Sequence, residues 1–448
     1  MSALLLEAGS GVGGTWYWNR YPGARCDVES MAYSFSFDRE LEQEWTWTEK
    51  YPTQPEILAY ANHVTDRFGL RDGITFDTRV LSAVWENGRW EVTTDTGEII
   101  HAQFVIMATG CLSASKLPEV PGLDRYAGDT FHTAHWPHEG VDFTGRRIGV
   151  IGTGSSGIQS IPVMAAQAAD TTVFQRTANF SMPAGNRVLT PEEVEATKET
   201  YPQLREAQRN SQSGIPRELP TQSALEVTPE ERTAAYEAGR AKGTLVALSG
   251  TYTDILMDLA ANETAAEFIR GKIREKVTDP ELAETLSPRT FPYGTKRPCL
   301  DSGYYETFNN DNVHLVDLRR TPLVEITERG VRTSEREYEF DAIVFATGFD
   351  AITGALLAID IRGRDGEELA KKWRDGPRTY LGLAMAGFPN LFTITGPSSP
   401  SVLSNMIVSI EQHVDWISRC IGHLREHGIA EIDPTVAAED EWVEHVEE

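Results

Sequence analysis

Basic residues, cysteines and long apolar runs are all scarce in this chain of 448 residues. Its 67 aspartates and glutamates outnumber its 41 lysines and arginines, so the formal net charge is −26 at pH 7. Nucleic acids and anionic membranes bind proteins through basic surfaces, and neither is therefore expected as a partner. No apolar run reaches the roughly 18 residues that mark a transmembrane helix.

The four cysteines are widely separated, at Cys26, Cys111, Cys299 and Cys420. Without a CxxC pair they predict neither a dithiol redox centre nor a zinc site. The opening segment, MSALLLEAGSG, lacks the basic flank and the apolar stretch of a secretory signal. A reducing, cytoplasmic setting is therefore the expected one.

Strand-like and helix-like segments alternate along the chain, and this alternation is typical of an α/β fold with parallel sheets. A polar and acidic stretch at about 180–290 has helical spacing without strand alternation, so it indicates a helical insertion. A segment rich in proline and glycine at 117–145 predicts a loop. The expected strands lie within residues 4–6, 75–107, 146–157, 171–176, 313–316 and 340–350, and the clearest helices at 55–69 and 405–428.

The most informative motif is the segment IGVIGTGSSGIQSIPVMA at 148–165, where an apolar strand leads through a GxGxxG pattern into a helix. The first glycine permits the tight turn, the second lets the backbone approach a pyrophosphate, and the third lets helix and strand pack closely. The helix N-terminus then faces the phosphates with its N–H groups. The residues predicted to bind this dinucleotide are Gly152, Thr153, Gly154, Ser155, Ser156 and Gly157.

Arg176 ends the next predicted strand, 19 residues beyond Gly157. NAD sites carry an acidic residue at about this distance, whereas a cation there suits the 2′-phosphate of NADPH. On its own this arginine could equally be a solvated charge at a strand end. Together with the glycine motif it favours NADPH as the dinucleotide.

A second GxGxxG match, from Gly9 to Gly14, follows the predicted strand at the N-terminus. The residues after it, TWYWNRYPG, do not have a helical pattern. Without a helix N-terminus the phosphate-binding mechanism is lost. These glycines are therefore not expected to bind a pyrophosphate.

A further motif, YAGDTFHTAHWP, occupies residues 126–137. It resembles the FxGxxxHxxxWP signature of the Baeyer–Villiger monooxygenases, with tyrosine in place of the first phenylalanine. The residues that match are Gly128, His132, Trp136 and Pro137. Segments similar to the same family lie at 13–30, 294–309 and 396–414 and at the two ATG sequences, 108–110 and 346–348, so the resemblance covers nearly the whole chain.

The resemblance implies two Rossmann-like dinucleotide-binding domains, one for FAD and one for NADPH, with a helical insertion. The expected division assigns residues 1–113 and 350–448 to the FAD domain and residues 114–349 to the NADPH domain. Glu7 corresponds to the acid that binds the FAD ribose, so the chain is expected to begin inside the second strand of the FAD unit. It is also expected to end before the segment that closes over the active site.

In that family NADPH reduces FAD, the reduced flavin captures O2, and a C4a-peroxyflavin attacks a ketone to give an ester or lactone. Arg297 matches the catalytic arginine, and a guanidinium suits this chemistry because it stays protonated and offers several donors to anions. Asp27 matches the acid that positions this arginine, although on the residues alone it could be a turn residue or a helix N-cap. Lys296 matches a second contact to the 2′-phosphate, beside Arg176 and Thr177, and could otherwise be a solvated lysine.

The family's flavin contacts map to residues that are mostly in the first third of the chain. The tryptophans among them could equally be core aromatics. His132 is implied to couple the domains and the nicotinamide, and Trp136 is expected to pack in the core. The residues implied to contact FAD are Glu7, Thr15, Trp16, Trp18, Asp27, Tyr33, Val80 and Met406.

Three functional hypotheses are compatible with the sequence. The first is a Baeyer–Villiger monooxygenase that uses O2 on cyclic or arylaliphatic ketones, with oxidation of thioethers as a side activity. The second is a flavin-containing N- or S-monooxygenase, which the Trp-Pro end of the signature disfavours. The third is an inactive NADPH-binding fragment without the FAD glycines. No GxSxG or HExxH motif indicates a nucleophilic serine or a metal.

Overall fold

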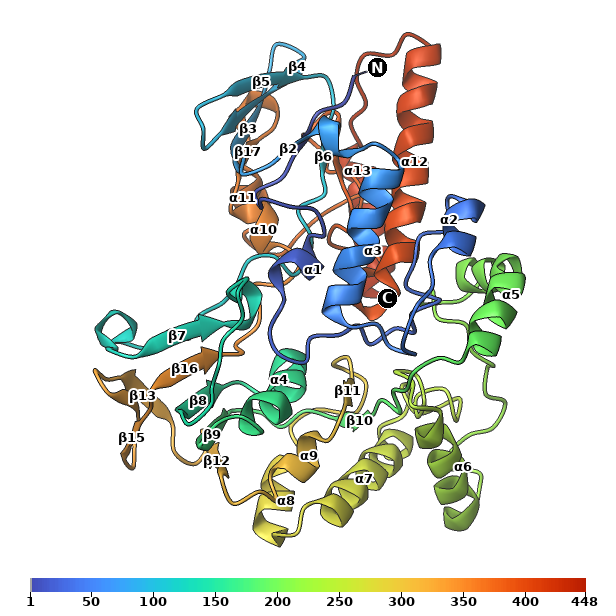
Figure 1. Ribbon diagram of the computed structural model, residues 1–448. Coiled ribbons are helices and arrows are strands. Elements are labelled where there is room, and N and C mark those ends of the chain that lie inside the picture. Colours follow the sequence, from blue (N-terminus) through green and yellow to red (C-terminus); the bar gives the residue numbers. More distant parts are fainter. Residues whose placement is uncertain (1) are drawn as a thin grey trace.

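The computed structural model describes residues 2–448, apart from the side chain of Ser401. Its largest sheet consists of β7 (Asp129–His132), β8 (Arg147–Ile151), β9 (Asp170–Gln175), β12 (Val313–Asp317) and β16 (Ala342–Phe345). These strands are all parallel, in the order β12–β9–β8–β16–β7 (Figure 1). Parallel sheets are covered on both faces, and all four residues of β16 are accordingly apolar and buried. The predicted α/β fold is confirmed.

Helix α4 (Ser155–Ala165) connects β8 to β9, which completes the strand–helix–strand unit predicted from the glycine motif. Strand β16 pairs with the other side of β8. The carboxyl ends of these parallel strands meet at one edge of the sheet, and the turn at 152–154 lies at that edge. In α/β sheets this edge is where dinucleotides bind.

Strands from the N-terminal part of the chain form smaller sheets, in which two of them pair with strands from the C-terminal part. The parallel pairs are β1 (Leu5–Leu6) with β2 (Ile74–Thr75), β6 (Val105–Met107) with β18 (Leu391–Thr393), and β3 (Val80–Glu86) with β17 (Asp360–Arg362). Strand β3 continues into antiparallel β4 (Arg89–Thr94) and β5 (Ile99–Ala102). Asn87 and Gly88 have positive φ in the first hairpin turn, as an Asn-Gly step predicts.

Four helices occupy the predicted insertion: α5 (Pro191–Arg209), α6 (Pro229–Lys242), α7 (Leu259–Lys276) and α8 (Pro280–Leu286). Both α5 and α6 begin with the sequence Thr-Pro-Glu-Glu, at 190–193 and 228–231. In each, the threonine caps the helix, the second glutamate completes a capping box, and proline takes the first helical position. The short strands β10 (Ser181–Pro183) and β11 (Cys299–Asp301) pair where the insertion starts and ends.

The predicted helices at 55–69 and 405–428 are confirmed as α3 (Gln54–Arg67) and α12 (Met406–Glu426). Asn405 caps α12, because its side-chain oxygen accepts the N–H of Ile407. The other helices are α2 (Arg39–Glu44), α9 (Tyr304–Thr307), α10 (Gly354–Leu357), α11 (Leu369–Lys372) and α13 (Val436–Glu447). In Figure 1 the five-stranded sheet and helices α6–α8 occupy one end of the molecule, and β3–β5 occupy the other.

One apolar core joins the five-stranded sheet, α4 and the insertion, and includes the fully buried Trp47, Ile161 and Leu248. A second core lies under β3 and β4, around Trp90 and Phe388. No helix within residues 2–448 combines the length and the apolar character needed to cross a bilayer.

Three local expectations from the sequence were incomplete or wrong. The predicted loop at 117–145 contains β7, whose four residues become ordered by pairing with the edge of β16. The segment TWYW forms one helical turn, α1 (Thr15–Trp18), although no helical pattern was expected there. An antiparallel meander of β13 (Leu323–Ile326), β14 (Gly330–Thr333) and β15 (Glu337–Glu339) was not predicted.

We expect Lys372→Met to destabilise the protein by about 3–5 kcal/mol, because it leaves a buried carboxylate without its cationic partner. Lys372 Nζ lies 2.8 Å from Glu439, whose side chain is 1% exposed. The matched control is Lys371→Met, since Lys371 is 75% exposed in its pair with Glu368 and its loss should cost less than about 1 kcal/mol. Urea unfolding followed by circular dichroism measures both, and equal midpoints for the two variants would contradict the prediction.

Candidate functional site

The glycines of the turn after β8 have three different environments. Gly152 has a φ of +116°, and a Cβ on it would lie 2.3 Å from the carbonyl oxygen of Ala346. A Cβ on Gly157 would lie 2.4 Å from the carbonyl oxygen of Gly152. Around Gly154 no atom lies within 4 Å of such a Cβ. The first and third glycines therefore allow the fold to close, whereas the second leaves open space that fits a bound pyrophosphate.

The N-terminus of α4 is suited to an anion. No side chain caps it, so the N–H groups of its first turn are available to a ligand. The Thr153 hydroxyl donates to the carbonyl oxygen of Thr177 at 3.0 Å, which fixes the turn against the end of β9. Ser155 Oγ lies 3.1 Å from Cys299 Sγ. Burial raises the pKa of the Cys299 thiol to about 12, so this neighbour stays uncharged.

Two cations flank residues that bond to this turn, namely Thr177 and Cys299. Arg176 precedes Thr177, and Lys296 lies three residues before Cys299. Both side chains are exposed, and Lys296 Nζ lies 4.5 Å from the ring centroid of Phe291. Neither forms an ion pair within residues 2–448. Unpaired cations beside an open helix N-terminus fit a ligand that carries a further phosphate.

The structure brings Arg297 and Asp27 together, although 270 positions separate them in the sequence. Nε and Nη2 of Arg297 donate to the two carboxylate oxygens of Asp27, both at 2.8 Å. The side chains are 22% and 26% exposed, so the pair is largely withdrawn from water. Burial alone would lower the pKa of Arg297, but the charge and hydrogen bonds of Asp27 outweigh it and raise that pKa. The guanidinium therefore remains a permanent cation in a fixed orientation.

A third donor of Arg297 is also occupied, because Nη1 donates to the carbonyl oxygen of Val402. A guanidinium has five N–H groups, so about two stay free for a ligand. Apart from Asp27, the neighbouring Cys26 and Tyr33 are neutral, since burial raises the pKa of the Cys26 thiol and of the Tyr33 hydroxyl well above their usual ranges. Arg297 is thus a fixed cation with spare donors in a site of low dielectric, which suits an anionic oxygen.

The residues predicted to contact FAD, apart from Asp27, come from several elements in the N-terminal part of the chain and from the start of α12. Trp16 Nε1 donates to the Tyr33 hydroxyl at 3.2 Å, which places this aromatic pair beside the Arg297 environment. Glu7 directly follows β1, and its Oε1 accepts the N–H of Gly9 at 2.7 Å. The N–H of Thr78 donates to the carbonyl oxygen of Glu7, close to the start of β3. The remaining candidates are Thr15 and Trp18 in α1, Val80 in β3 and Met406 at the start of α12.

These residues fit a flavin dinucleotide, because several large apolar side chains among them stay accessible. Trp16, Trp18, Val80 and Met406 are all only partly buried, and Thr15 is exposed. A purely structural role would favour full burial for such large apolar groups. Glu7 supplies the acceptor that a ribose hydroxyl requires.

His132 of the signature contacts two connecting segments, one at Lys116 and one at Thr347. Its Nδ1 accepts the N–H of Ala134 at 3.0 Å, so Nε2 carries the proton and donates to the carbonyl oxygen of Lys116 at 3.3 Å. Thr347 Oγ1 lies 3.3 Å from the same nitrogen. Burial lowers the pKa of His132 and favours the neutral ring. The N–H of Lys116 donates to the carbonyl oxygen of Gly348, so the two segments also bond directly to each other. His132 therefore helps to hold them together.

Other signature residues are structural in this fold. Trp136 is buried, and its ring centroid lies 5.5 Å from that of Phe131 and 6.1 Å from that of Phe143. A Cβ on Gly128 would lie 2.9 Å from the carbonyl oxygen of Asp341. The motif therefore holds β7 in place at the edge of the sheet while it orients His132.

Known proteins resemble this chain over nearly its whole length. A family model described as pyridine nucleotide-disulphide oxidoreductase matches residues 30–223. A Baeyer–Villiger monooxygenase from Pseudooceanicola batsensis is 42% identical, over 98% of this chain and 80% of its own length. This chain belongs to the Baeyer–Villiger monooxygenases. The family predicted from the signature is confirmed.

Two solved structures extend this assignment to the fold of the Baeyer–Villiger monooxygenases. An oxidized steroid monooxygenase bound to NADP is 55% identical, with a TM-score of 0.94 over 98% of this chain and 84% of its own. A complex of OTEMO with FAD and NADP is 42% identical, with a TM-score of 0.96 over 99% and 84%. The predicted pair of Rossmann-like domains with a helical insertion is therefore confirmed.

The sequence did not identify several contacts that join the two halves of this monooxygenase. Tyr21 donates to Gln159 Oε1 at 2.9 Å, and Gln159 Nε2 donates to the carbonyl oxygen of Arg25 at 3.1 Å. The ring centroids of Trp18 and His135 lie 5.9 Å apart. Nothing in the local sequence of Tyr21 or Gln159 indicates a partner in the other half of the molecule. Only the position of Gln159, two residues after the glycine pattern, gave a signal.

We expect Gly154→Ala to weaken NADPH binding at least tenfold without lowering the melting temperature, because its Cβ enters only the open space above the turn. Gly152→Ala is the matched control for the backbone, since its Cβ would collide with Ala346 and should destabilise the fold. Calorimetric titration and thermal unfolding measure the two effects. Unchanged NADPH affinity in Gly154→Ala would contradict the assignment of this turn.

Proposed function

We propose that this protein inserts one oxygen atom from O2 next to the carbonyl group of a ketone, with FAD and NADPH as cofactors. The overall conversion takes a ketone, O2, NADPH and a proton to an ester or lactone, water and NADP⁺. The observation that carries this proposal is the Arg297–Asp27 pair, which presents free guanidinium donors in a site enclosed by neutral groups. A thioether is a second acceptor of the oxygen atom.

The turn at 152–157 is proposed to bind NADPH. The first-turn N–H groups of α4, together with Thr153, Ser155 and Ser156, would hold the pyrophosphate. Arg176, Thr177 and Lys296 would hold the 2′-phosphate. This assignment is supported by the open space at Gly154 and by the unpaired state of both cations.

The second cofactor site is proposed to lie between α1, β1 and the start of α12. Glu7 would bind the ribose, and Trp16, Tyr33 and Met406 would enclose the ring system. The chemistry supplied by bound FAD is the acceptance of two electrons from NADPH and the activation of O2. The aromatic and apolar side chains on this side would exclude water, which protects the reactive oxygen from loss as hydrogen peroxide.

Arg297 is proposed as the catalytic residue and Asp27 as the residue that orients it. Attack on a ketone carbonyl creates an oxyanion, and a preorganised cation lowers the free energy of the state in which this charge develops. Because the carboxylate engages two donors, the guanidinium plane cannot rotate. The remaining donors therefore point in one direction at all times. His132 would keep the connecting segments in register while the nicotinamide is positioned.

The strand pairing supports a division into domains. We infer an FAD domain formed by residues 1–113 and 350–448 and an NADPH domain formed by 114–349. All strands of the five-stranded sheet fall in the second range, while β17 and β18 pair back onto strands of the first. The cytoplasmic setting expected from the composition stays a prediction.

Arg297→Ala is expected to reduce ester formation by a factor of 100 or more, which is about the effect of removing a key donor to an oxyanion. The protein is incubated with FAD, desalted and supplied with NADPH and cyclohexanone in air, and lactone is quantified by gas chromatography. NADPH binding should change less than about threefold. Ester formation at the unchanged rate would refute the proposed role.

The matched control for this substitution is Arg25→Ala. Arg25 pairs with Glu49 at 3.0 Å, and the two side chains are 23% and 29% exposed, so the burial resembles that of the Arg297 pair. It lies in the same segment as Asp27. Lactone formation should be retained in this variant, and an equal loss in both variants would indicate a general effect of removing an arginine.

Arg176→Ala is expected to raise the dissociation constant for NADPH ten- to hundredfold and to leave that for NADH nearly unchanged. A hydrogen bond to a charged group contributes about 1.5–3 kcal/mol, and only NADPH carries the phosphate that this guanidinium would contact. Arg336→Ala, at an exposed arginine without an ion pair in the β14–β15 hairpin, serves as the control. Equal weakening of both dinucleotides would contradict the assignment of the phosphate.

A further inference from the structure

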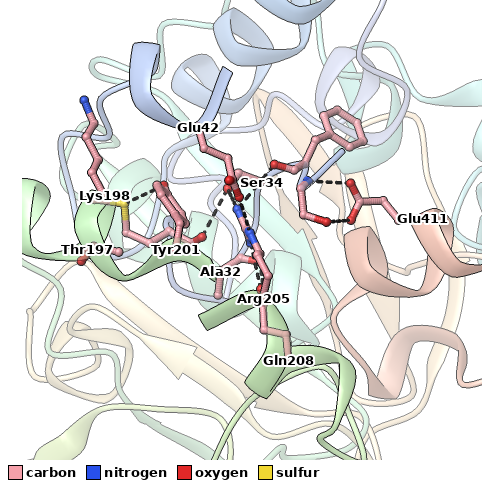
Figure 2. A network of polar contacts seen from close by, with 12 residues as sticks. Ala32, Ser34, Glu42, Thr197, Lys198, Tyr201, Arg205, Gln208 and Glu411 are labelled. Atoms are coloured by element: carbon pink, nitrogen blue, oxygen red, sulfur yellow. Dashed lines mark hydrogen bonds and ion pairs between the residues drawn. The ribbon is translucent and has the colours of Figure 1, made fainter. Parts of the chain in front are cut away.

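A buried polar network joins the helical insertion to the N-terminal part of the chain (Figure 2). Arg205 of α5 donates through Nε to Glu42 at 2.7 Å, and both side chains are only 6% exposed. Its Nη1 donates to Gln208 Oε1 at 2.8 Å and its Nη2 to Ser34 Oγ at 2.7 Å. The guanidinium also lies 4.9 Å from the ring centroid of Tyr201.

An ion pair this deeply buried gains little stability over an apolar pair of the same size, because both charges lose their hydration. Its distinguishing property is geometric, since Nε, Nη1 and Nη2 of Arg205 all have defined acceptors. The network therefore fixes the position of α5 relative to residues 32–42. That segment begins five residues after Asp27.

The network continues to the carbonyl oxygen of Ala32, which accepts two side-chain amides. Gln208 Nε2 donates to it at 2.9 Å, and Asn405 Nδ2 donates to it at 2.7 Å. The N–H groups of Ala32 and Tyr33 both donate to the carbonyl oxygen of Glu29 at 2.9 Å. Ala32 is thus rigidly connected to the turn that follows Asp27.

Asn405 connects the carbonyl oxygen of Ala32 to the segment that contains Val402, the backbone acceptor of Arg297. It lies three residues after Val402 and caps α12, and its backbone N–H donates to the carbonyl oxygen of Ser213 at 2.7 Å. Glu411, six residues further along in α12, accepts both the N–H and the hydroxyl of Ser36. The segment with Asp27 and the segment with Val402 are therefore held together at the carbonyl oxygen of Ala32. Helix α5 contacts this junction through Gln208.

We propose that Arg205, acting with Glu42 and Gln208, is a positioning residue for Arg297. It sets the separation between the Asp27 carboxylate and the Val402 carbonyl, and this separation determines where the free donors of the guanidinium point. The inference rests on the proposed role of Arg297 in oxygen transfer. A displacement of about 1 Å in such a group can reduce a rate on the order of a hundredfold.

The test uses the double variant Arg205→Met/Glu42→Leu, which removes the network without leaving a buried charge unpaired. The control is Lys372→Met/Glu439→Leu, which replaces another buried pair, between α11 and α13, in the same way. Gln208→Leu provides a second variant that keeps the ion pair and removes the bonds of Gln208 to Arg205 Nη1 and to Ala32. All are compared as proteins loaded with FAD.

The first readout is steady-state lactone formation from cyclohexanone. We expect a tenfold or greater fall in kcat for the Arg205/Glu42 variant, a smaller fall for Gln208→Leu, and a KM for NADPH within about twofold of the wild type. The Lys372/Glu439 control should keep its kcat. A kcat within twofold of the wild type in the Arg205/Glu42 variant, or an equal loss in the control, would overturn the proposal.

The second readout does not depend on activity. Hydrogen exchange followed by mass spectrometry should show at least tenfold faster exchange in peptides that cover 29–36 and 402–409 for the Arg205/Glu42 variant and unchanged exchange there for the Lys372/Glu439 control. Unchanged exchange there would overturn the positioning role even if activity fell. Because this measurement is independent of Arg297 chemistry, it separates failure of the inference from failure of the proposed function, which Arg297→Ala alone decides.

Discussion

The structure depends most on the ion pair between Arg297 and Asp27. It joins the end of the helical insertion to a turn near the N-terminus, and its third donor reaches the segment that precedes α12. Three distant parts of the chain therefore meet at one guanidinium. Since the pair is largely withdrawn from water, its geometry is stiff and its charges are weakly screened. An enzyme that must stabilise an oxyanion at a defined point gains directly from such an arrangement.

The turn at 152–157 is connected to the segment that contains Asp27 through contacts of α4. Gln159 of α4 bonds to both Tyr21 and the backbone of Arg25, and a Cβ on Gly23 would lie 2.4 Å from the carbonyl oxygen of Gln159. The helix whose N-terminus faces the pyrophosphate is thus in contact with the segment that holds Asp27. The same scaffold orients both the nucleotide and the cation. His132 adds a second connection where the chain passes between the two halves.

Much of this could be predicted from the sequence because the relevant signals are local. The glycine pattern specifies its own turn, and its strand and helix follow within a few residues; the Thr-Pro-Glu-Glu segments likewise specify two helix starts. Arg297 and Asp27 were found only through resemblance, since nothing in either segment indicates a partner 270 residues away. Strand β7 and the junction at Ala32 were missed for the same reason. Each is ordered by contacts with remote elements, not by its own pattern.

The measurement that tests the central claim most directly is oxygen labelling. The protein, loaded with FAD, converts cyclohexanone with NADPH under ¹⁸O2 in unlabelled water, and the lactone is analysed by mass spectrometry. If oxygen is inserted beside the carbonyl as described, each lactone molecule carries one ¹⁸O atom, located in the ring, and one NADPH is consumed for each lactone formed. Unlabelled product, or NADPH consumed with hydrogen peroxide as the only oxygen product, would contradict the account.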